Sequence, residues 1–358
     1  MARYDYIGAR RVARRDYGNA TRMVYQYDEL KRVTGTTHIL DPDGIAGVFD
    51  NRAYTWDAMH NKTSRRDLMP GGVTNIYSYD SLYRMIRSSR TSTNPIPEVV
   101  DYGLDGVGNR TTVSGGTHPG SYTMDPSLPG PADAQLNQYS TTSFDIRRND
   151  DNGNLAFVNR GLPNEKVFVY DYRNRMVLHS NQASATVTSY AYDALGRRIQ
   201  KVVDDGTPET TRFFHQAWQV VEEQDENGAT LATYVYGRYI DEPLTMQRGG
   251  TNFFYHGDDL YNVMKVTDAA GDVVESYDYG DYGQPRFFDE NGVEILESRI
   301  GNPYLFTGRR FDSESGFYYY RTRYLDPEAG RFTTRDTIGI WGDPDNLGNG
   351  YTYVGNNP

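Results

Sequence analysis

A short signature constrains the fold most: an aromatic residue, any residue, then Tyr-Asp, with an arginine a few positions later. Its clearest copies are Tyr25-Gln26-Tyr27-Asp28 with Arg32, Tyr77-Ser78-Tyr79-Asp80 with Arg84, and Tyr190-Ala191-Tyr192-Asp193 with Arg197. In a β-strand the two aromatic side chains lie on one face, where neighbouring strands can stack them into ladders. We expect the aspartate to accept turn amides and the arginine to pair with a carboxylate on the next strand. One such unit cannot bury its own aromatic face, so the repeat predicts stacked units.

The spacing of turn residues sets the length of the unit. Gly206, Gly228 and Gly250 lie 22 residues apart, and Gly271 and Gly292 follow at intervals of 21. Aromatic clusters fall midway between these glycines, so each unit fits two strands of about eight residues and two tight turns. The sequence therefore predicts an all-β fold of repeated antiparallel β-hairpins, most regular between residues 150 and 300.

Composition permits this fold only if tyrosine builds the core. Leu, Ile, Val and Phe make up 70 of the 358 residues, whereas the chain has 31 tyrosines and 3 tryptophans. At a net charge of -11 the aliphatic residues alone would place the chain near the disordered class. Adding the large aromatic residues makes a packed core possible, and 36 glycines with 16 prolines indicate many turns.

Several classes of protein are excluded or disfavoured. The chain has no cysteine, which excludes disulfides, thiolate metal sites and a cysteine nucleophile. An acidic chain is a poor candidate for binding nucleic acid. We find neither an apolar run long enough to span a membrane nor the apolar stretch of a signal peptide at the N-terminus. One segment, 114–134, holds four glycines and four prolines. We interpret it as a long exposed loop, with a domain linker as the alternative.

The repeats resemble the Rhs or YD repeat, whose pattern is Gly-Asn, then Tyr-x-Tyr-Asp and Arg. Residues 16–32 match almost one whole unit and residues 151–175 match another. The last part of the chain resembles the Rhs repeat-associated core domain. The matching core residues include Gly308, Gly316, Tyr318, Arg323, Tyr324, Gly330, Arg331, Phe332, Arg335 and Asp336. This resemblance divides the chain into a shell fragment, 1–300, and a core domain, 301–358.

The resemblance implies hairpins wound into a hollow spiral β-shell with the core domain as a plug. In bacterial members of the family a toxin follows the core, is cut free by an aspartyl autoprotease of the core, and stays inside the shell until delivery. We therefore expect about one turn of shell with its plug, from an exported or extracellular protein whose full-length form carries a covalently linked C-terminal toxin. Because the sequence stops at Pro358, before the family's Asp-Pro-x-Gly-Leu cleavage segment, we expect these residues to include neither the cleavage site nor the toxin.

Asp336 is the family-matched candidate for aspartyl chemistry, with Arg335 beside it. Such chemistry needs two carboxylates close enough to share a proton. Possible partners for Asp336 are Asp326, Asp343 and Asp345. The alternative is that these aspartates begin ordinary turns. Thr337, where the family has proline, and the inserted Gly348-Asn349-Gly350 both depart from the family pattern. As it stands, we expect the chain not to be an enzyme.

Neither a metal nor a cofactor is expected. The six histidines, His38, His60, His118, His179, His215 and His256, show no metal-ligand spacing in the sequence. His256-Gly257-Asp258 lies inside a repeat unit and is interpreted as structural. Aromatic side chains can also stack on sugars, and the candidates for an exposed platform are Trp56, Trp218 and Trp341.

Three functional hypotheses follow. The first is a structural module that encapsulates and delivers a polymorphic toxin. The alternative is an extracellular module for adhesion or glycan binding, and the third is an intramolecular aspartyl autoprotease. A partial spiral also leaves an open edge strand, so we expect either self-association through that edge or its cover by 114–134.

Overall fold

The structure, a computed structural model, describes residues 2–8, 11–40, 47–91, 98–124, 136–339 and 346–358. These residues form antiparallel β-strands, with short 3-10 turns such as η2 (Phe306–Gly308) and η5 (Val354–Asn356), and α-helix is absent from them. The all-β prediction is confirmed. Within the described ranges, no helix is long and apolar enough to cross a membrane.

Two large sheets form the shell, and every strand pairs with its neighbour in the sequence. The 11-stranded sheet contains β1 (Arg3–Ile7), β2 (Arg11–Asp16), β3 (Thr21–Tyr27), β4 (Val33–Leu40), β5 (Val48–Trp56), β6 (Lys62–Asp67), β7 (Thr74–Tyr79), β8 (Met85–Thr91), β9 (Glu98–Leu104), β10 (Arg110–Ser114) and β11 (Gly120–Ser121). The 15-stranded sheet contains β14 (Arg147–Asn149), β15 (Leu155–Val158), β16 (Lys166–Tyr170), β17 (Met176–Asn181), β18 (Thr186–Tyr192), β19 (Arg198–Asp204), β20 (Glu209–Gln216), β21 (Gln219–Gln224), β22 (Thr230–Tyr236), β23 (Pro243–Arg248), β24 (Thr251–Gly257), β25 (Val263–Thr267), β26 (Val273–Tyr279), β27 (Pro285–Asp289) and β28 (Glu294–Ile295).

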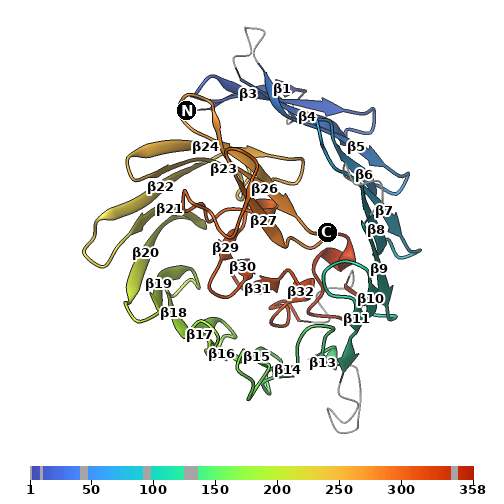
Figure 1. Cartoon of the computed structure of the whole chain (residues 1–358), viewed down its shortest axis with the longest axis vertical. Helices are drawn as coiled ribbons and strands as arrows, with labels where there is room; N and C mark the ends of the chain where they lie inside the picture. The colour runs from blue at the N-terminus through green and yellow to red at the C-terminus, as the bar shows by residue number, and fades with distance from the viewer. Residues whose placement is uncertain (1, 9–10, 41–46, 92–97, 125–135, 340–345) are drawn as a thin grey trace.

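The two sheets follow an unclosed spiral (Figure 1). The first sheet forms one side of the arc, β14 to β21 continue it, and β22 to β27 return beside the first sheet. Contacts across this overlap join residues far apart in sequence: Asn19 donates to the Thr267 hydroxyl at 2.9 Å, and Lys62 pairs with Asp259 at 2.9 Å. The predicted partial spiral of hairpins is confirmed.

The C-terminal segment lies inside this arc (Figure 1). It forms a separate 4-stranded sheet of β29 (Arg310–Asp312), β30 (Phe317–Tyr319), β31 (Tyr324–Asp326) and β32 (Arg331–Phe332). Its side chains share one core with the shell, because Leu305, Tyr318 and Leu325 pack in the same buried cluster as Met246 and Tyr255. We call residues 301–358 the plug.

The aspartate of the repeat closes a hairpin turn, as predicted. Asp80 Oδ1 accepts the backbone N–H groups of Leu82 and Arg84 at 2.9 and 3.0 Å. The expected partner of the arginine is wrong, however. Arg84 pairs with Asp80 of its own turn at 2.7 Å and donates to the Asp105 carbonyl of the next turn at 2.7 Å. The same own-turn ion pair forms between Arg32 and Asp28 and between Arg197 and Asp193. The tight turn places the arginine closer to the aspartate four residues earlier than to a carboxylate on the neighbouring strand.

Replacing Asp80 by alanine should lower the free energy of unfolding by about 2 kcal/mol, because two turn amides lose their acceptor. Asp80→Asn is the control, since it keeps an acceptor oxygen and loses only a partly exposed ion pair worth up to about 1 kcal/mol. Urea unfolding followed by tyrosine fluorescence measures both. Equal losses in the two variants would contradict the assigned role of the amide bonds.

Tyrosine supplies the core and also ties the strands together. The second tyrosine of the signature donates its hydroxyl to a carbonyl of an earlier strand, as in Tyr79 to Lys62 at 2.7 Å and Tyr192 to Met176 at 2.7 Å. Tyr27 does the same with Val12 at 2.8 Å and stacks with Tyr25, with ring centres 6.2 Å apart. The predicted same-face placement of the two aromatics is therefore present.

The segment 114–134 is structured in its described part. It contributes β11, which pairs with β10 at the end of the first sheet, and β12 (Thr123–Met124), which pairs with β13 (Tyr139–Thr141). Tyr122 between them is buried, at 7% exposed. Residues 125–135 lie outside the described residues. The exposed-loop expectation thus does not describe 120–124, because the aromatic side chain draws this stretch into the core.

Candidate functional site: the interface between shell and plug

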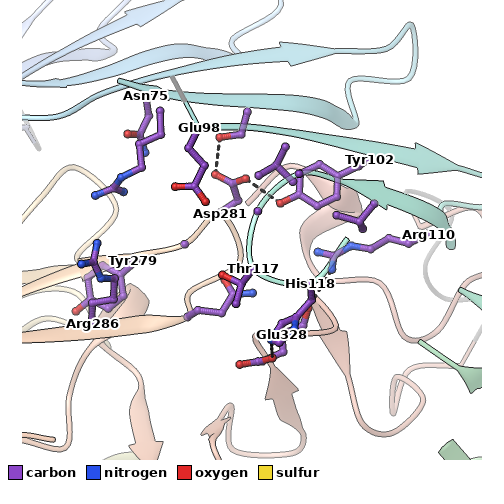
Figure 2. Close-up of a pocket in the computed structure, with 18 of the residues that line it drawn as sticks. Asn75, Glu98, Tyr102, Arg110, Thr117, His118, Tyr279, Asp281, Arg286 and Glu328 are labelled. Carbon is purple, nitrogen blue, oxygen red and sulfur yellow. Dashed lines mark hydrogen bonds and ion pairs between the residues drawn. The ribbon is translucent and has the colours of Figure 1, made fainter. Parts of the chain in front are cut away.

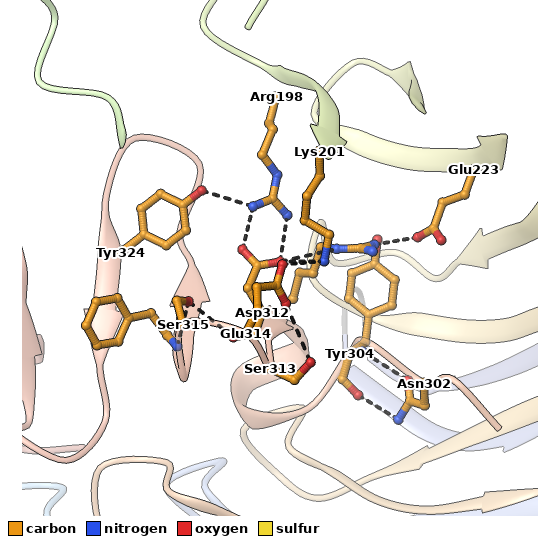
Figure 3. A network of polar contacts seen from close by, with 12 residues as sticks. Arg198, Lys201, Glu223, Asn302, Tyr304, Asp312, Ser313, Glu314, Ser315 and Tyr324 are labelled. Carbon is orange, nitrogen blue, oxygen red and sulfur yellow. Dashed lines mark hydrogen bonds and ion pairs between the residues drawn. The ribbon is translucent and has the colours of Figure 1, made fainter. Parts of the chain in front are cut away.

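Buried ion pairs fasten the plug to the inner face of the shell. Arg198 at the start of β19 contacts both carboxylate oxygens of Asp312 on β29, at 2.5 and 3.1 Å, and both side chains are fully buried. Tyr324 of the plug accepts a further bond from Arg198 at 2.9 Å (Figure 3). Although burial raises the pKa of Asp312, Arg198 and Lys201 hold it below its usual range. The pair is therefore charged when folded.

A second buried pair lies beside the first. Glu223 of β21 accepts from Arg310 of the plug at 2.5 Å and from Arg248 of the shell at 2.8 Å. Burial raises the pKa of Glu223, but the two arginines outweigh it and keep the pKa below its ordinary value. Because the two plug residues lie on one short strand, β29 is held at both ends by opposite charges.

Close backbone contact also requires glycine in the plug. Gly308 has φ +65°, and a Cβ built there would lie 1.8 Å from the carbonyl oxygen of Asp241. Gly330 has φ +67°, and its Cβ would meet the buried guanidinium of Arg110, which stacks over Tyr282 at 4.2 Å. Gly316 has φ +80° with open space around it. These family-matched glycines therefore serve a close approach at two positions and a turn at the third.

The other core-motif residues are mostly buried. Tyr318 donates to the Gly283 carbonyl at 2.8 Å, and Arg331 donates to the Asn137 carbonyl at 2.6 Å. Arg323 lies over the ring of Phe332, 3.6 Å from its centre. All four thus join the plug to itself or to the shell.

Asparagines dock the C-terminal end on hairpin turns of the first sheet. Asn357 donates to Asn61 Oδ1 at 2.9 Å, and Asn356 donates to the Gly108 carbonyl at 2.9 Å. Asn349, inside the stretch that departs from the family pattern, donates to Asn109 Oδ1 at 2.9 Å. The inserted residues therefore help to seat the plug.

Asp336 lies in a turn near this insertion. Its Oδ2 pairs with Arg323 at 2.6 Å, and its Oδ1 accepts the Ile338 N–H at 3.1 Å. Its own N–H donates to the Gly350 carbonyl at 2.9 Å. Arg335 instead donates to the Tyr351 hydroxyl at 3.3 Å. In the part of the chain that the structure describes, the polar contacts of Asp336 include no carboxylate.

Asp326 lies elsewhere in the plug. Its carboxylate pairs with the buried Arg147 of β14 at 2.7 Å. Burial and then the negative charge of Asp326 raise the pKa of Glu328, two residues away. Both acids line a cavity of about 860 Å³ between plug and shell. The structure therefore brings Asp326 together with Glu328, which sequence reasoning missed; Asp343 and Asp345 lie outside the described residues.

A second cavity, of about 420 Å³, is lined by a half-buried acid, Asp281, that the sequence analysis also missed. Asp281 accepts hydroxyl bonds from Ser88 and Tyr102, each at 2.8 Å (Figure 2). Burial raises the pKa of Asp281. Its signal in the sequence is Gly280, which occupies the place of the usual turn aspartate and leaves Asp281 one position later, free to point at the first sheet.

The remaining candidates for binding are less favourable. The Trp56 indole donates to the Val33 carbonyl at 2.8 Å, and Lys62 lies over its ring at 5.4 Å, so this face is occupied. Trp218 is 42% exposed, and Trp341 lies outside the described residues. Among the residues described, no cluster of three or more metal-binding side chains occurs.

Comparison with known proteins bears on the whole architecture. No family model matches the chain. It is 28% identical to the tRNA3(Ser)-specific nuclease WapA of Bacillus spizizenii over 73% of its length, and 25% identical to the double-stranded DNA deaminase toxin A of Burkholderia cenocepacia over 94%. It spans only 10% and 28% of those two proteins. The crystal structure of TcdB2-TccC3 superposes on 97% of this chain, and on 19% of its own, with a TM-score of 0.72 at 18% identity.

The chain forms an Rhs/YD-repeat shell. Because the superposition covers both sheets and the plug, the two structures share the path of the shell as well as the structure of single hairpins. Relatives named as toxins, including the toxin protein Tse5 of Pseudomonas aeruginosa, place this Rhs shell among the modules that toxin proteins carry.

Proposed function

We propose that this Rhs shell and its plug form the encapsulation and delivery module of a polymorphic toxin, which the complete protein carries as a covalently linked C-terminal segment. The observation that carries the proposal is the plug inside the arc, held by the buried Arg198–Asp312 and Arg310–Glu223 pairs. Residue 358 lies next to Asn357, which is docked on the inner turn at Asn61, so a segment attached there would start at the shell. Export of the complete protein belongs to the same proposal.

The test compares the complete natural protein with a variant whose plug is loosened. Limited trypsin digestion should leave the C-terminal segment protected in the natural protein and cut it rapidly in Asp312→Ala. Arg197→Ala, which alters only a surface turn, is the control and should protect like the natural protein. A C-terminal segment that is cut equally fast in all three would contradict encapsulation.

Autoproteolysis by the plug is a separate proposal, supported by the family match at Asp336 and, elsewhere in the plug, by the acids Asp326 and Glu328, which line one cavity. An Asp-Pro-x-Gly-Leu segment placed after Pro358 should be cleaved, as judged on a denaturing gel. Asp336→Asn should abolish cleavage if Asp336 acts, and Glu328→Gln should abolish it if the acid pair acts. If the added segment stays intact in the unsubstituted protein, the proposal is wrong, and the role of Asp336 is limited to its turn and its ion pair with Arg323.

A further inference from the structure

Two histidines from distant parts of the chain meet between the overlapping layers of the shell. His38 lies on β4 of the first sheet and His256 on β24 of the second, and neither is exposed. Their Nδ1 atoms are 3.2 Å apart, and the rings meet edge to face at 84°. Tyr17 and Phe49 pack on the His256 ring, with centres 4.8 and 4.9 Å away. The contact between the two histidines is therefore shielded from solvent, and it joins the two sheets.

The hydrogen-bond partners fix where the protons lie. The Gly257 carbonyl, 2.9 Å from His38 Nε2, can only accept, so His38 carries its proton on Nε2. His38 Nδ1 must then accept from the Nδ1–H of His256. That leaves His256 Nε2 to accept from the Thr267 hydroxyl at 2.9 Å. The Thr267 oxygen in turn accepts from Asn19 at 2.9 Å. A one-way chain of hydrogen bonds thus crosses the layers with both imidazoles neutral.

Neither imidazole can take up a further proton without disrupting this series of hydrogen bonds. On His38 Nδ1 it would set two N–H groups against each other. On His256 Nε2 it would create a buried cation beside other cations. The charged groups that face the pair come from β2, β5 and β25: Arg15, Asp50, Arg52 and Lys265. The one anion among them, Asp50, is already held by Arg52 through two bonds of 2.9 and 2.7 Å.

We propose that the His38–His256 pair is an acid-sensitive latch, closed while both rings are neutral, whose protonation separates β24 and β25 from the first sheet and opens the overlap of the shell. This property goes beyond encapsulation, because it states a condition under which the enclosure loosens. It rests on the interlayer position of the pair and on its single permitted arrangement of protons.

The direction of the pH effect follows from the two states. An exposed histidine in the open overlap titrates near 6.5. In the closed shell, burial, only partly offset by Asp50, lowers the pKa of His38 to about 4, and burial with the nearby positive charges lowers the pKa of His256 well below its usual value. Only the open state binds the proton between these values, so closure is favoured above pH 6.5 and weakens as the pH falls towards 4. At pH 5, His38 alone shifts the balance towards opening by about 30-fold relative to pH 8.

Acids at the same overlap act in the opposite direction. Burial raises the pKa of both Asp259 and Asp281, so the closed state binds their protons more readily than the open state. The test must therefore remove the histidines and leave these acids in place.

Hydrogen exchange of the full chain, followed by mass spectrometry at pH 8 and pH 5 and corrected for intrinsic exchange, measures the latch. Peptides covering β4 and β24 should lose at least tenfold protection at pH 5. In the double variant His38→Asn/His256→Asn, an amide oxygen can still accept and an amide N–H can still donate across the contact. This variant should be less protected at pH 8 but show no further loss of protection in these peptides at pH 5.

The matched control is His179→Asn. His179 is equally buried on β17, and burial lowers its pKa to about 4, but its ring stacks on Phe168 within one sheet. This variant should keep the response of β4 and β24. If the double variant does not fold, His256→Asn alone retains a donor to His38 and should reduce the response. Unchanged protection of the natural protein between the two pH values, or a response that survives removal of the histidines, would overturn the proposal.

Discussion

Replacing Arg198 by alanine should unseat the plug and lower the free energy of unfolding by about 3–5 kcal/mol. The substitution leaves the carboxylate of Asp312 fully buried without its main partner, and it removes the guanidinium stacked on Tyr319 at 4.3 Å. Urea unfolding monitored by tyrosine fluorescence measures the loss. Arg197→Ala is a close control, because the neighbouring arginine forms a partly exposed pair with Asp193 and should cost no more than about 1 kcal/mol.

Replacing both charged residues by apolar ones separates the net contribution of the ion pair to stability from the cost of leaving one buried charge without a partner. Arg198→Met combined with Asp312→Leu removes both charges and fills much of the space, so it should recover most of the stability lost in Arg198→Ala. A loss in Arg198→Ala no larger than that in Arg197→Ala would show that Asp312 is hydrated, and the buried interface described here would be wrong.

The second large effect is expected for Gly308→Ala. The new Cβ would lie 1.8 Å from the Asp241 carbonyl oxygen, on a backbone with φ +65°, so the η2 turn must leave its place. We expect a loss of at least about 3 kcal/mol, or failure to fold. Gly316→Ala is the matched control, because φ is +80° but nothing lies within 4 Å of the added carbon. It should cost about 1 kcal/mol.

Thermal unfolding and soluble yield measure the difference between these two variants. Both glycines adopt positive φ, but only Gly308 contacts the shell. The difference between the two variants therefore measures the effect of the close approach of plug and shell. Equal midpoints for the two variants would indicate that strain of the backbone alone sets the requirement for glycine.

The sequence predicted what depends on neighbouring residues. Turn glycines at intervals of 22 and 21 residues, and the Tyr-x-Tyr-Asp signature, depend on strand alternation and turn geometry, so the hairpins and their stacking could be anticipated. The resemblance added the path of the spiral and the position of the plug. The error about Arg84 has a local cause as well, because the turn geometry favours its own Asp80 over a more distant carboxylate.

Contacts between distant residues could not be predicted in this way. Arg198 and Asp312 are 114 residues apart, and His38 and His256 are 218 apart, so no spacing rule connects either pair. Ligand spacing along the chain does not indicate that the two histidines meet, because only the spiral brings them together between layers. The sequence marks Asp281 only by its displacement of one position from the usual turn aspartate. Its partners on β8 and β9 could not be predicted, because they meet it only where the two sheets overlap.

The central claim is that the plug is enclosed by the shell, and cysteine labelling tests it most directly because the chain has no cysteine of its own. Ser313 and Ser315 lie in one turn between β29 and β30, and both line the cavity shared with the shell. Ser313 is exposed, whereas Ser315 is buried, at 1% exposed. With a small thiol reagent under native conditions, Ser313→Cys should react at nearly the rate of the unfolded chain. Ser315→Cys should react at least a hundredfold more slowly, and faster again when Arg198→Ala is added. Equal, rapid labelling at both positions in the folded protein would show that the plug is not enclosed, and would contradict the account.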